Sequence, residues 1–233
     1  MVRRIIEKDE IIRALSVIWK PLTNEQREQL IRNISTCYFK QNEIIYKEGD
    51  DPTHIMILIH GKVKIFKDGV GGRNQIVRII NEKGIFAYRA AFRNEPYITT
   101  ASAFENSLIG MIPFDFFMRL IHENNYLAVN FIRELSELLG IADRRTVNLT
   151  QKHIRARLAE SILWLKDKYG VEEDGSTLNI YLSREDLANL SNMTTSNAIR
   201  TLSVFAHEDI IAIDGRKIKI INSEELCEIS RLG

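Results

Sequence analysis

The chain has 233 residues, of which 45% are hydrophobic and 27% charged, and its formal net charge is +1. This composition is typical of one large or two modest globular domains and excludes a disordered or fibrous chain. Because the net charge is close to zero, DNA binding has to be argued from where cations lie rather than from their number.

The two cysteines, Cys37 and Cys227, lie far apart in the sequence. One chain therefore cannot supply the ligands of a Cys₄ zinc site or a cysteine-ligated iron–sulfur cluster, so we exclude an iron–sulfur cofactor. Isolated thiols fit a reducing cytoplasm. No apolar run reaches the roughly 18 residues of a membrane span, and the first residues, MVRRIIEKDEII, lack the apolar core of a signal peptide. We expect a cytoplasmic protein that does not bind a membrane.

Residues 1–34 have the apolar spacing of helices. The apolar residues that recur three or four positions apart are Ile5, Ile6, Ile12, Leu15, Ile18 and Trp19. Pro21 interrupts this pattern, and Thr23 then resembles the cap of a second helix, with Leu30, Ile31 and Ile34 on one face.

From about Thr36 to Pro113 the pattern changes to short β-branched and aromatic runs. Glycines and acidic turns, such as Gly49 and Gly71-Gly72, separate the runs EIIY, HIMILIH, KVKIF, QIVRII, ITTASA and SLIGMI. KVKIF alternates, with Val63 and Ile65 on one face and lysines on the other. Many short strands at regular spacing predict an antiparallel sandwich or barrel.

A helical stretch without proline follows from about Phe114 to Tyr169. Inside it, apolar and small residues repeat at spacings of four and three, which predicts a coiled-coil dimer interface. The residues of this seam are Ala128, Ile132, Leu135, Leu139, Ala142, Thr146 and Leu149. Burying the four large aliphatic side chains of each protomer stabilises a dimer by roughly 12–24 kcal/mol, against an association cost of about 4–15 kcal/mol. The alternative is a helix that packs only on its own domain.

The segment LSREDLANLSNMTTSNAIRTLSVF, residues 182–205, predicts two short helices joined by a tight turn. Ser183 and Asp186 resemble a capping box, Asn192 suits the left-handed end of a helix, and Thr194 caps the second helix. The apolar face expected for the second helix is Ala198, Ile199, Leu202 and Phe205. Two β-branched runs around Asp214-Gly215 then predict a hairpin, which completes a winged helix-turn-helix.

The exposed face expected for the second helix carries short hydrogen-bonding groups and one guanidinium: Thr195, Ser196, Asn197 and Arg200. Such a set can read base edges in the major groove, where arginine suits the O6 and N7 atoms of guanine. Arg184, Arg216, Lys217 and Lys219 would then contact phosphates, which position the protein without specifying sequence. The alternative is a small structural bundle with ordinary polar surface residues.

From about Pro21 onward the chain resembles the cyclic-AMP receptor and fumarate–nitrate reductase regulator (Crp/Fnr) family of bacterial transcription regulators. The resemblance covers the glycine-punctuated barrel, Ala103-Phe-Glu-Asn-Ser107, the long helix, the stretch from Arg157 to Ala159, and LSREDLANL, TSNAIRTL and GRKIKI. It implies an α+β fold: an antiparallel jelly-roll barrel as sensor (residues 1–124), a dimerisation helix (125–152) and a C-terminal winged helix-turn-helix that binds DNA (153–233).

The resemblance also implies a homodimer that binds a palindromic operator in double-stranded DNA, with RNA polymerase as a further partner if the protein is an activator. Family DNA contacts carry over by position to Ser183, Arg184, Thr194, Thr195, Ser196, Asn197, Arg200 and Arg216. Where this chain has Ser196 the family usually has Glu, which puts the usual operator sequence in doubt. His153 stands where the family usually has an Asp that caps the next helix.

Family members that bind cyclic nucleotides present a Glu to the ribose and clamp the phosphate with Arg-Ser or Arg-Thr. The matching positions here are Arg89 and Thr99-Thr100. An arginine cannot accept a hydrogen bond from the ribose hydroxyl, so we expect cyclic AMP to bind weakly or not at all. The effector is a small molecule that the sequence does not name, and a barrel without any effector is an alternative.

Haem stays open as a cofactor, with His54, His60, His122, Tyr88, Tyr97 and the N-terminus as candidate ligands. His54 and His60 do not form the HxH pattern of a cupin metal site, and we expect no metal site. No nucleophile–base pair and no glycine-rich phosphate loop points to an enzyme. The main alternative function is a ligand- or haem-sensing signalling module whose winged helix contacts proteins.

Overall fold

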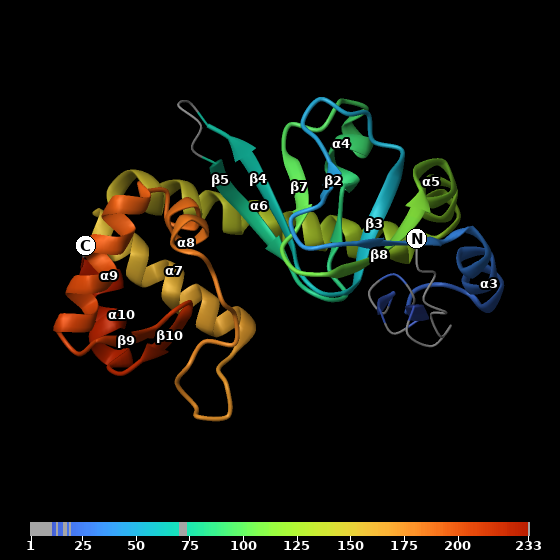
Figure 1. Ribbon diagram of the computed structural model, residues 1–233. Coiled ribbons are helices and arrows are strands. Elements are labelled where there is room, and N and C mark those ends of the chain that lie inside the picture. The colour runs from blue at the N-terminus through green and yellow to red at the C-terminus, as the bar shows by residue number, and fades with distance from the viewer. Residues whose placement is uncertain (1–10, 13, 16–17, 19, 70–73, 233) are drawn as a thin grey trace. The chain divides into compact units, whose positions relative to one another are not determined.

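The computed structural model describes residues 11, 12, 14, 15, 18, 20–69 and 74–232 (Figure 1). The predictions made on Ile5, Ile6, Trp19 and Gly71-Gly72 lie outside these residues. Contacts divide the chain into two compact units, Met1–Asp68 with Ile76–Leu138 and Gly69–Gln75 with Leu139–Gly233. The boundary at Leu138 falls inside a helix, so that helix contributes to both units.

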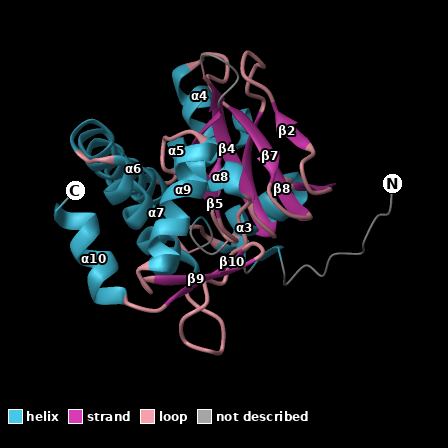
Figure 2. Cartoon of the chain, turned by 60° about the vertical axis from the view of Figure 1, so that its left-hand side comes forward, coloured by secondary structure: helices cyan, strands magenta, loops and turns pink. Residues whose placement is uncertain are grey.

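The first unit contains a sandwich of two four-stranded antiparallel sheets, as the sequence predicted (Figure 2). One sheet has the order β1-β8-β3-β6 and the other β2-β7-β4-β5. The strands of the first sheet are β1 (Ser35–Phe39), β8 (Ser107–Pro113), β3 (His54–His60) and β6 (Ile85–Phe86), and those of the second are β2 (Ile44–Tyr46), β7 (Thr100–Ala103), β4 (Val63–Asp68) and β5 (Asn74–Ile80). The sequence did not predict β1 or the two-residue β6.

Alternation determines which strand residues fill the sandwich. Val63 and Ile65 of β4 are both buried, as the KVKIF pattern predicted. In β3 five consecutive residues from Ile55 to Ile59 are buried, because both faces of this central strand are covered. A cluster of buried hydrophobic side chains joins the sheet that contains β3 to the surrounding helices, and it includes Ile57, Phe117 and Phe131.

Helices α3 (Asn24–Asn33), α4 (Tyr88–Arg93) and α5 (Phe114–Glu123) belong to this unit. Thr23 caps α3 in a complete capping box with Gln26, which confirms the predicted start of that helix. Leu30 is fully buried, whereas Ile31 and Ile34 are partly buried against the same cluster.

The predicted helical stretch from Phe114 to Tyr169 consists of three helices: α5, α6 (Asn125–Gln151) and α7 (Ile154–Tyr169). The first break lies at Asn124, whose side-chain amide donates to the Pro21 carbonyl at 2.7 Å and to Gln26 at 2.9 Å, while its side-chain oxygen accepts from the Leu127 N–H. The second break lies at Lys152 and His153. His153 is the N-cap of α7, but its side chain makes no capping hydrogen bond.

The second unit is mainly helical and holds α7, α8 (Arg184–Leu190), α9 (Thr195–His207) and α10 (Ser223–Leu232), together with the hairpin of β9 (Ile211–Asp214) and β10 (Lys217–Ile220). The sequence did not predict α10, which packs on α7. Among the described residues, no helix is both long enough and apolar enough to cross a membrane.

Candidate nucleic-acid interface

Helices α8 and α9 form the predicted helix-turn-helix, and local interactions determine where each begins. The Ser183 hydroxyl accepts from the Asp186 N–H at 3.0 Å, and the Thr194 hydroxyl accepts from the Asn197 N–H at 3.2 Å. Asn192, in the turn between the helices, has a φ of 50°, as predicted from its tolerance of the left-handed region. Ser183 and Thr194 thus have capping roles.

Buried apolar side chains hold the two helices together. Those of α8 are Leu187, Ala188 and Leu190, and those of α9 are Ala198, Leu202 and Phe205. Near the C-terminal end of α9, Arg155 of α7 forms an ion pair with Glu208 and lies over the Phe205 ring, 5.0 Å from its centroid. These contacts fix the helix that carries the predicted base-reading residues.

The prediction for Ile199 was wrong. It was assigned to the buried face of α9, but its side chain is 47% exposed. The helical repeat of about 3.6 residues explains this, because Ala198, Leu202 and Phe205 follow one stripe and Ile199 lies about 100° from Ala198. The exposed face of α9 therefore carries Thr195, Ser196, Ile199 and Arg200, with Asn197 half-buried.

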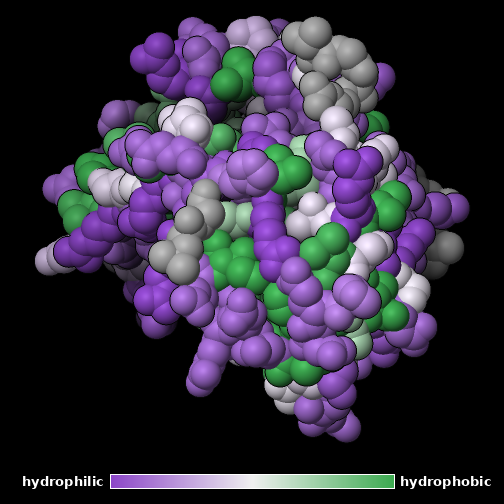
Figure 3. Space-filling model, turned by 90° about the vertical axis from the view of Figure 1, so that its left-hand side faces the viewer, coloured by the Kyte–Doolittle hydropathy of each residue, from purple (hydrophilic) through white to green (hydrophobic). Residues whose placement is uncertain are grey.

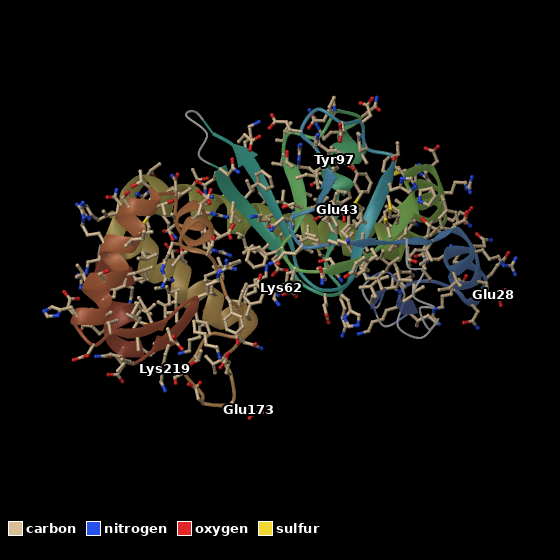
Figure 4. All side chains as sticks on the ribbon, viewed as in Figure 1. Glu28, Glu43, Lys62, Tyr97, Glu173 and Lys219 are labelled. Carbon is tan, nitrogen blue, oxygen red and sulfur yellow. The ribbon has the colours of Figure 1, made fainter. Side chains whose placement is uncertain are left out.

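Cations around the helix-turn-helix differ in whether the protein already uses them. The Arg184 guanidinium donates to the Gly215 carbonyl of the wing turn at 2.7 Å. Lys217 pairs with Glu172 at 3.1 Å, and Lys219, labelled in Figure 4, pairs with Asp174 at 3.3 Å. Arg200 and Arg216 are exposed and have no ion-pair partner among the described residues. These two arginines can therefore bind an external anion or base without breaking an internal contact.

The wing is a tight hairpin in which Lys217 pairs with Asp214 across the strands. Its two turn residues are Gly215 and Arg216, one position later than the Asp214-Gly215 turn expected from the sequence. Gly215 has a φ of 53°, which a glycine adopts without strain. This places Arg216 at the tip of the wing.

Hydrogen bonds order the loop after α7, whose carboxylates Glu172 and Asp174 pair with the two wing lysines. The Tyr181 hydroxyl donates to Glu172, and this bond together with Lys217 holds the pKa of Glu172 below its usual range. The Asp174 carboxylate accepts from the Thr177 and Ser176 N–H groups at 2.8 and 3.0 Å, which strongly lowers the pKa of Asp174. Lys217 and Lys219 are therefore positioned by fixed carboxylates.

The predicted dimer seam lies on an exposed face of α6. Ile132 and Leu139 are 61% and 63% exposed, and Leu135 is also exposed. Ala142 and Thr146 are exposed, whereas Ala128 and Leu149 are half-buried. The neighbouring stripe of α6, with Leu127 and Phe131, is buried in the barrel's own cluster. The helix thus has one face that stabilises the barrel and another that is available to a partner.

Beyond the seam, polar contacts brace α6 against the C-terminal unit. The Arg145 guanidinium donates to the Leu190 carbonyl at the end of α8 at 3.1 Å. Across the break at His153, Glu160 of α7 accepts from Asn148 and pairs with Lys152 at 3.2 Å. Burial lowers the pKa of Arg145, and the nearby Glu160 carboxylate opposes that effect.

In the barrel, the three predicted effector residues already have protein partners. Arg89 pairs with Glu95 at 2.7 Å. Thr100 is buried, and its hydroxyl accepts from the Glu48 N–H at 3.1 Å. Thr99 hydrogen-bonds Tyr46, and this bond and the nearby Arg89 charge partly offset the effect of burial, which raises the pKa of Tyr46.

Sequence reasoning missed Tyr46, which hydrogen-bonds Thr99 and lies near the Arg89 charge. Its ring stacks on Tyr97, labelled in Figure 4, with centroids 3.8 Å apart and planes 19° apart. Burial raises the pKa of Tyr97, and the charges of Tyr46 and Asp50 add to the effect. Nothing in the local sequence links residues 46 and 97, because backbone hydrogen bonds of Tyr97 with Gly49 and Asp50, next to the pairing of β2 with β7, bring them together.

The candidate haem ligands lie in different surroundings, and the N-terminus is outside the described residues. His60 pairs with Glu82 at 2.8 Å, His54 hydrogen-bonds Thr53 at 2.8 Å, and His122 is exposed. Tyr88 and Tyr97 are buried. In the described part of the chain, no group of three or more His, Cys, Asp or Glu side chains is arranged to hold a metal ion.

Two family models match the chain. A cyclic nucleotide-binding domain matches residues 36–124, and a Crp-like helix-turn-helix domain matches residues 156–229. Among curated relatives, the CRP-like cAMP-activated global transcriptional regulator of Mycobacterium tuberculosis is 23% identical over 96% of this chain and 100% of its own length. The anaerobic regulatory protein of Bacillus subtilis is 24% identical over 86% of this chain and 87% of its own. Among solved structures, FixK2 from Bradyrhizobium japonicum has a TM-score of 0.76 at 18% identity, over 86% of this chain and 98% of that one.

Proposed function

The chain belongs to the Crp/Fnr family of DNA-binding transcription regulators, and we propose that it works as a homodimer whose two α9 helices read a palindromic operator. The observation that carries this proposal is the exposed face of α9, where Arg200 has no ion-pair partner among the described residues. Such an arginine is available to donate two hydrogen bonds to a guanine. We expect the protein to act in the cytoplasm. RNA polymerase would be a partner if the protein activates transcription.

The two arginines have different proposed roles. Arg200 lies in the N-terminal half of α9, the part of the recognition helix that contacts bases in helix-turn-helix proteins. Arg216 lies at the wing tip, where a phosphate contact adds affinity without sequence preference. Arg184 supports the wing through its bond to Gly215.

An operator selected from random duplexes tests these roles. We expect Arg200→Ala to weaken binding by about 1–3 kcal/mol for each half-site and to relax preference at one base position. Arg216→Ala should weaken binding to all sequences and lower the slope of affinity against salt by about 1 for each half-site. Arg231→Ala on α10 removes the same charge away from the helix-turn-helix and serves as the control. Unchanged sequence preference in Arg200→Ala would contradict the assignment.

The seam on α6 supports the homodimer. Ile132, Leu135 and Leu139 present a continuous apolar stripe that nothing in the described chain covers. The two recognition helices of such a dimer are expected to contact half-sites about 34 Å apart, one helical turn of DNA. Steep weakening by salt would distinguish DNA as the partner from a protein, because DNA binding releases counterions.

The sensor proposal is that the barrel has lost the usual cyclic-AMP clamp. Support comes from the pairing of Arg89 with Glu95 and from the use of Thr100 by the Glu48 N–H. Contact of Arg89 with a ligand anion would require breaking its pair with Glu95, and Thr99 offers no positive charge for the phosphate. The M. tuberculosis relative is described as cAMP-activated, so a direct comparison is informative. Isothermal titration should detect no micromolar cyclic-AMP binding to this chain, and binding at that strength would overturn the proposal. Absorbance of the native purified protein tests for haem.

A further inference from the structure

We propose that Ile199 reads the 5-methyl group of a thymine next to the guanine that Arg200 contacts. The inference rests on the proposed function and concerns a residue that the sequence had placed in the core. The starting observation is that the Ile199 side chain is 47% exposed. The other exposed large aliphatic side chain of α9 is Val204, at 38%. An exposed Ile on a face expected to contact DNA needs a chemical role.

The helical repeat places Ile199 within the DNA-facing arc. At about 100° per residue, Ile199 and Arg200 point about 100° apart, and Ser196 projects between them. All three side chains are exposed. Consecutive Cα atoms are about 3.8 Å apart and base pairs rise about 3.4 Å. Ile199 and Arg200 therefore reach base pairs that are the same or within about two steps of each other.

The polar neighbours leave apolar contact as the chemistry available to Ile199. The Ser203 hydroxyl donates to the Ile199 carbonyl at 3.0 Å, so this serine is used by its own helix. Ile199 offers no donor or acceptor from its side chain. In the major groove the one apolar group that distinguishes a base is the thymine methyl. The geometry thus predicts that thymine is preferred beside the guanine read by Arg200.

Deoxyuridine tests this directly, because it lacks only the methyl group of thymine. The full chain would select an operator from random duplexes, and each thymine would then be replaced in both half-sites by deoxyuridine. Affinities would be measured for the wild type, Ile199→Ala and Ile221→Ala by fluorescence anisotropy at two salt concentrations. Ile221 is 53% exposed and lies just after the wing, so it is a matched control for losing an exposed isoleucine.

For the wild type we expect one thymine per half-site at which the replacement weakens binding about four-fold, which corresponds to about 0.8 kcal/mol for one buried methyl group. The two half-sites together give about fifteen-fold. Ile199→Ala should be indifferent to the same replacement, whereas Ile221→Ala should respond like the wild type. The ratio should not change with salt, since a methyl contact releases no counterions.

Tight binding by the wild type that is indifferent to every deoxyuridine replacement would overturn the inference and leave the proposed function intact. Equal sensitivity of Ile199→Ala and the wild type at the same thymine would also overturn it. Absence of DNA binding by the wild type would overturn the proposed function and the inference together. The wild-type measurement does not depend on the folding of any variant.

Discussion

Arg200 on α9 and Arg89 on α4 are both exposed arginines at candidate binding positions, yet among the described residues only Arg89 has a carboxylate partner. Glu95 lies 2.7 Å from Arg89, whereas Arg200 pairs with no described residue. The exposed face of α9 can therefore contact an external partner without losing an ion pair, whereas Arg89 already stabilises its own domain. A group that is already satisfied loses a contact when it binds something else.

The same difference appears between two faces of α6. Leu127 and Phe131 are buried in the barrel's cluster, while Ile132, the residue after Phe131, and Leu139 are exposed. One apolar face of α6 is therefore buried within the barrel unit, and the other is exposed. Exposure of a contiguous apolar stripe is typical of an interaction surface. The following predictions test whether exposed groups bind partners and satisfied groups stabilise the fold.

The largest effect is expected from Leu139→Asp, which places a charge in the exposed seam of α6. The dimer should dissociate, because the charge would be desolvated in the interface. Losing bivalent binding should weaken operator affinity by about 10²–10⁴-fold. Light scattering and anisotropy measure the two effects. Val147→Asp introduces the same charge at a 50% exposed α6 position off the seam and should stay dimeric. A dimeric Leu139→Asp protein would break the comparison.

A smaller effect is expected from Arg145→Met, which keeps the length of the side chain but removes the charged hydrogen bond to the Leu190 carbonyl. Loss of such a bond costs about 1.5–3 kcal/mol. Amide hydrogen exchange in α8 should therefore become faster, because local opening of that helix is less costly. The neighbouring exposed Arg144→Met is the control. Equal exchange in both variants would show that Arg145 does not brace α8.

In the barrel, Thr100→Val removes the hydroxyl that accepts from the Glu48 N–H. We expect the barrel to lose about 1 kcal/mol, which lowers its melting temperature by about 2–4 °C. Thr36→Val on the exposed part of β1 should have less effect. Cyclic-AMP titration should give the same negative result for both variants. A Thr100→Val protein with normal stability but altered ligand binding would show that Thr100 serves a site rather than the fold.

The smallest effect concerns acid. The N–H groups of Thr177 and Ser176 favour the charged form of Asp174, so its pKa is lower in the folded than in the unfolded chain. The resulting stability is present above the unfolded pKa of about 3.9 and is lost as the pH falls toward the folded value. The melting temperature of Asp174→Asn should therefore be lower than that of the wild type at neutral pH. The difference between the two melting temperatures should become smaller below about pH 4. A gap that widens in acid would contradict this sign.

Features set by neighbouring residues were predictable from the sequence. The capping roles of Thr23, Ser183 and Thr194 depend on residues three positions away, so the pattern carries the whole interaction. The left-handed turn at Asn192 follows from its side chain. The strand runs in the barrel were found because alternation reports burial on a pleated sheet. The two-residue β6 and the six-residue α4 were missed because they are too short for a periodic pattern.

Features set by distant residues were not predictable. The partners of Arg184 and Lys217 are Gly215 and Glu172, which lie 31 and 45 residues away. The stacking of Tyr46 on Tyr97 depends on the sheet. The sequence assigned Arg200 to bases and Arg184, Arg216 and Lys217 to phosphates, but it could not show which of these cations already bind groups of the protein itself. The structure separates them on that basis.

The sequence by itself determined the order of barrel, long helix and winged helix-turn-helix, the helix caps and the family, because each depends on residue type and on spacings of a few residues. Only the tertiary structure decided that Ile199 faces solvent, that Arg200 and Arg216 have no carboxylate partner in the described part of the chain, and that Arg89 and Thr100 have partners within the barrel. Exposure and pairing are properties of the packed chain, since they depend on which distant surfaces cover a side chain. The same residue type therefore has different roles at Arg89 and Arg200.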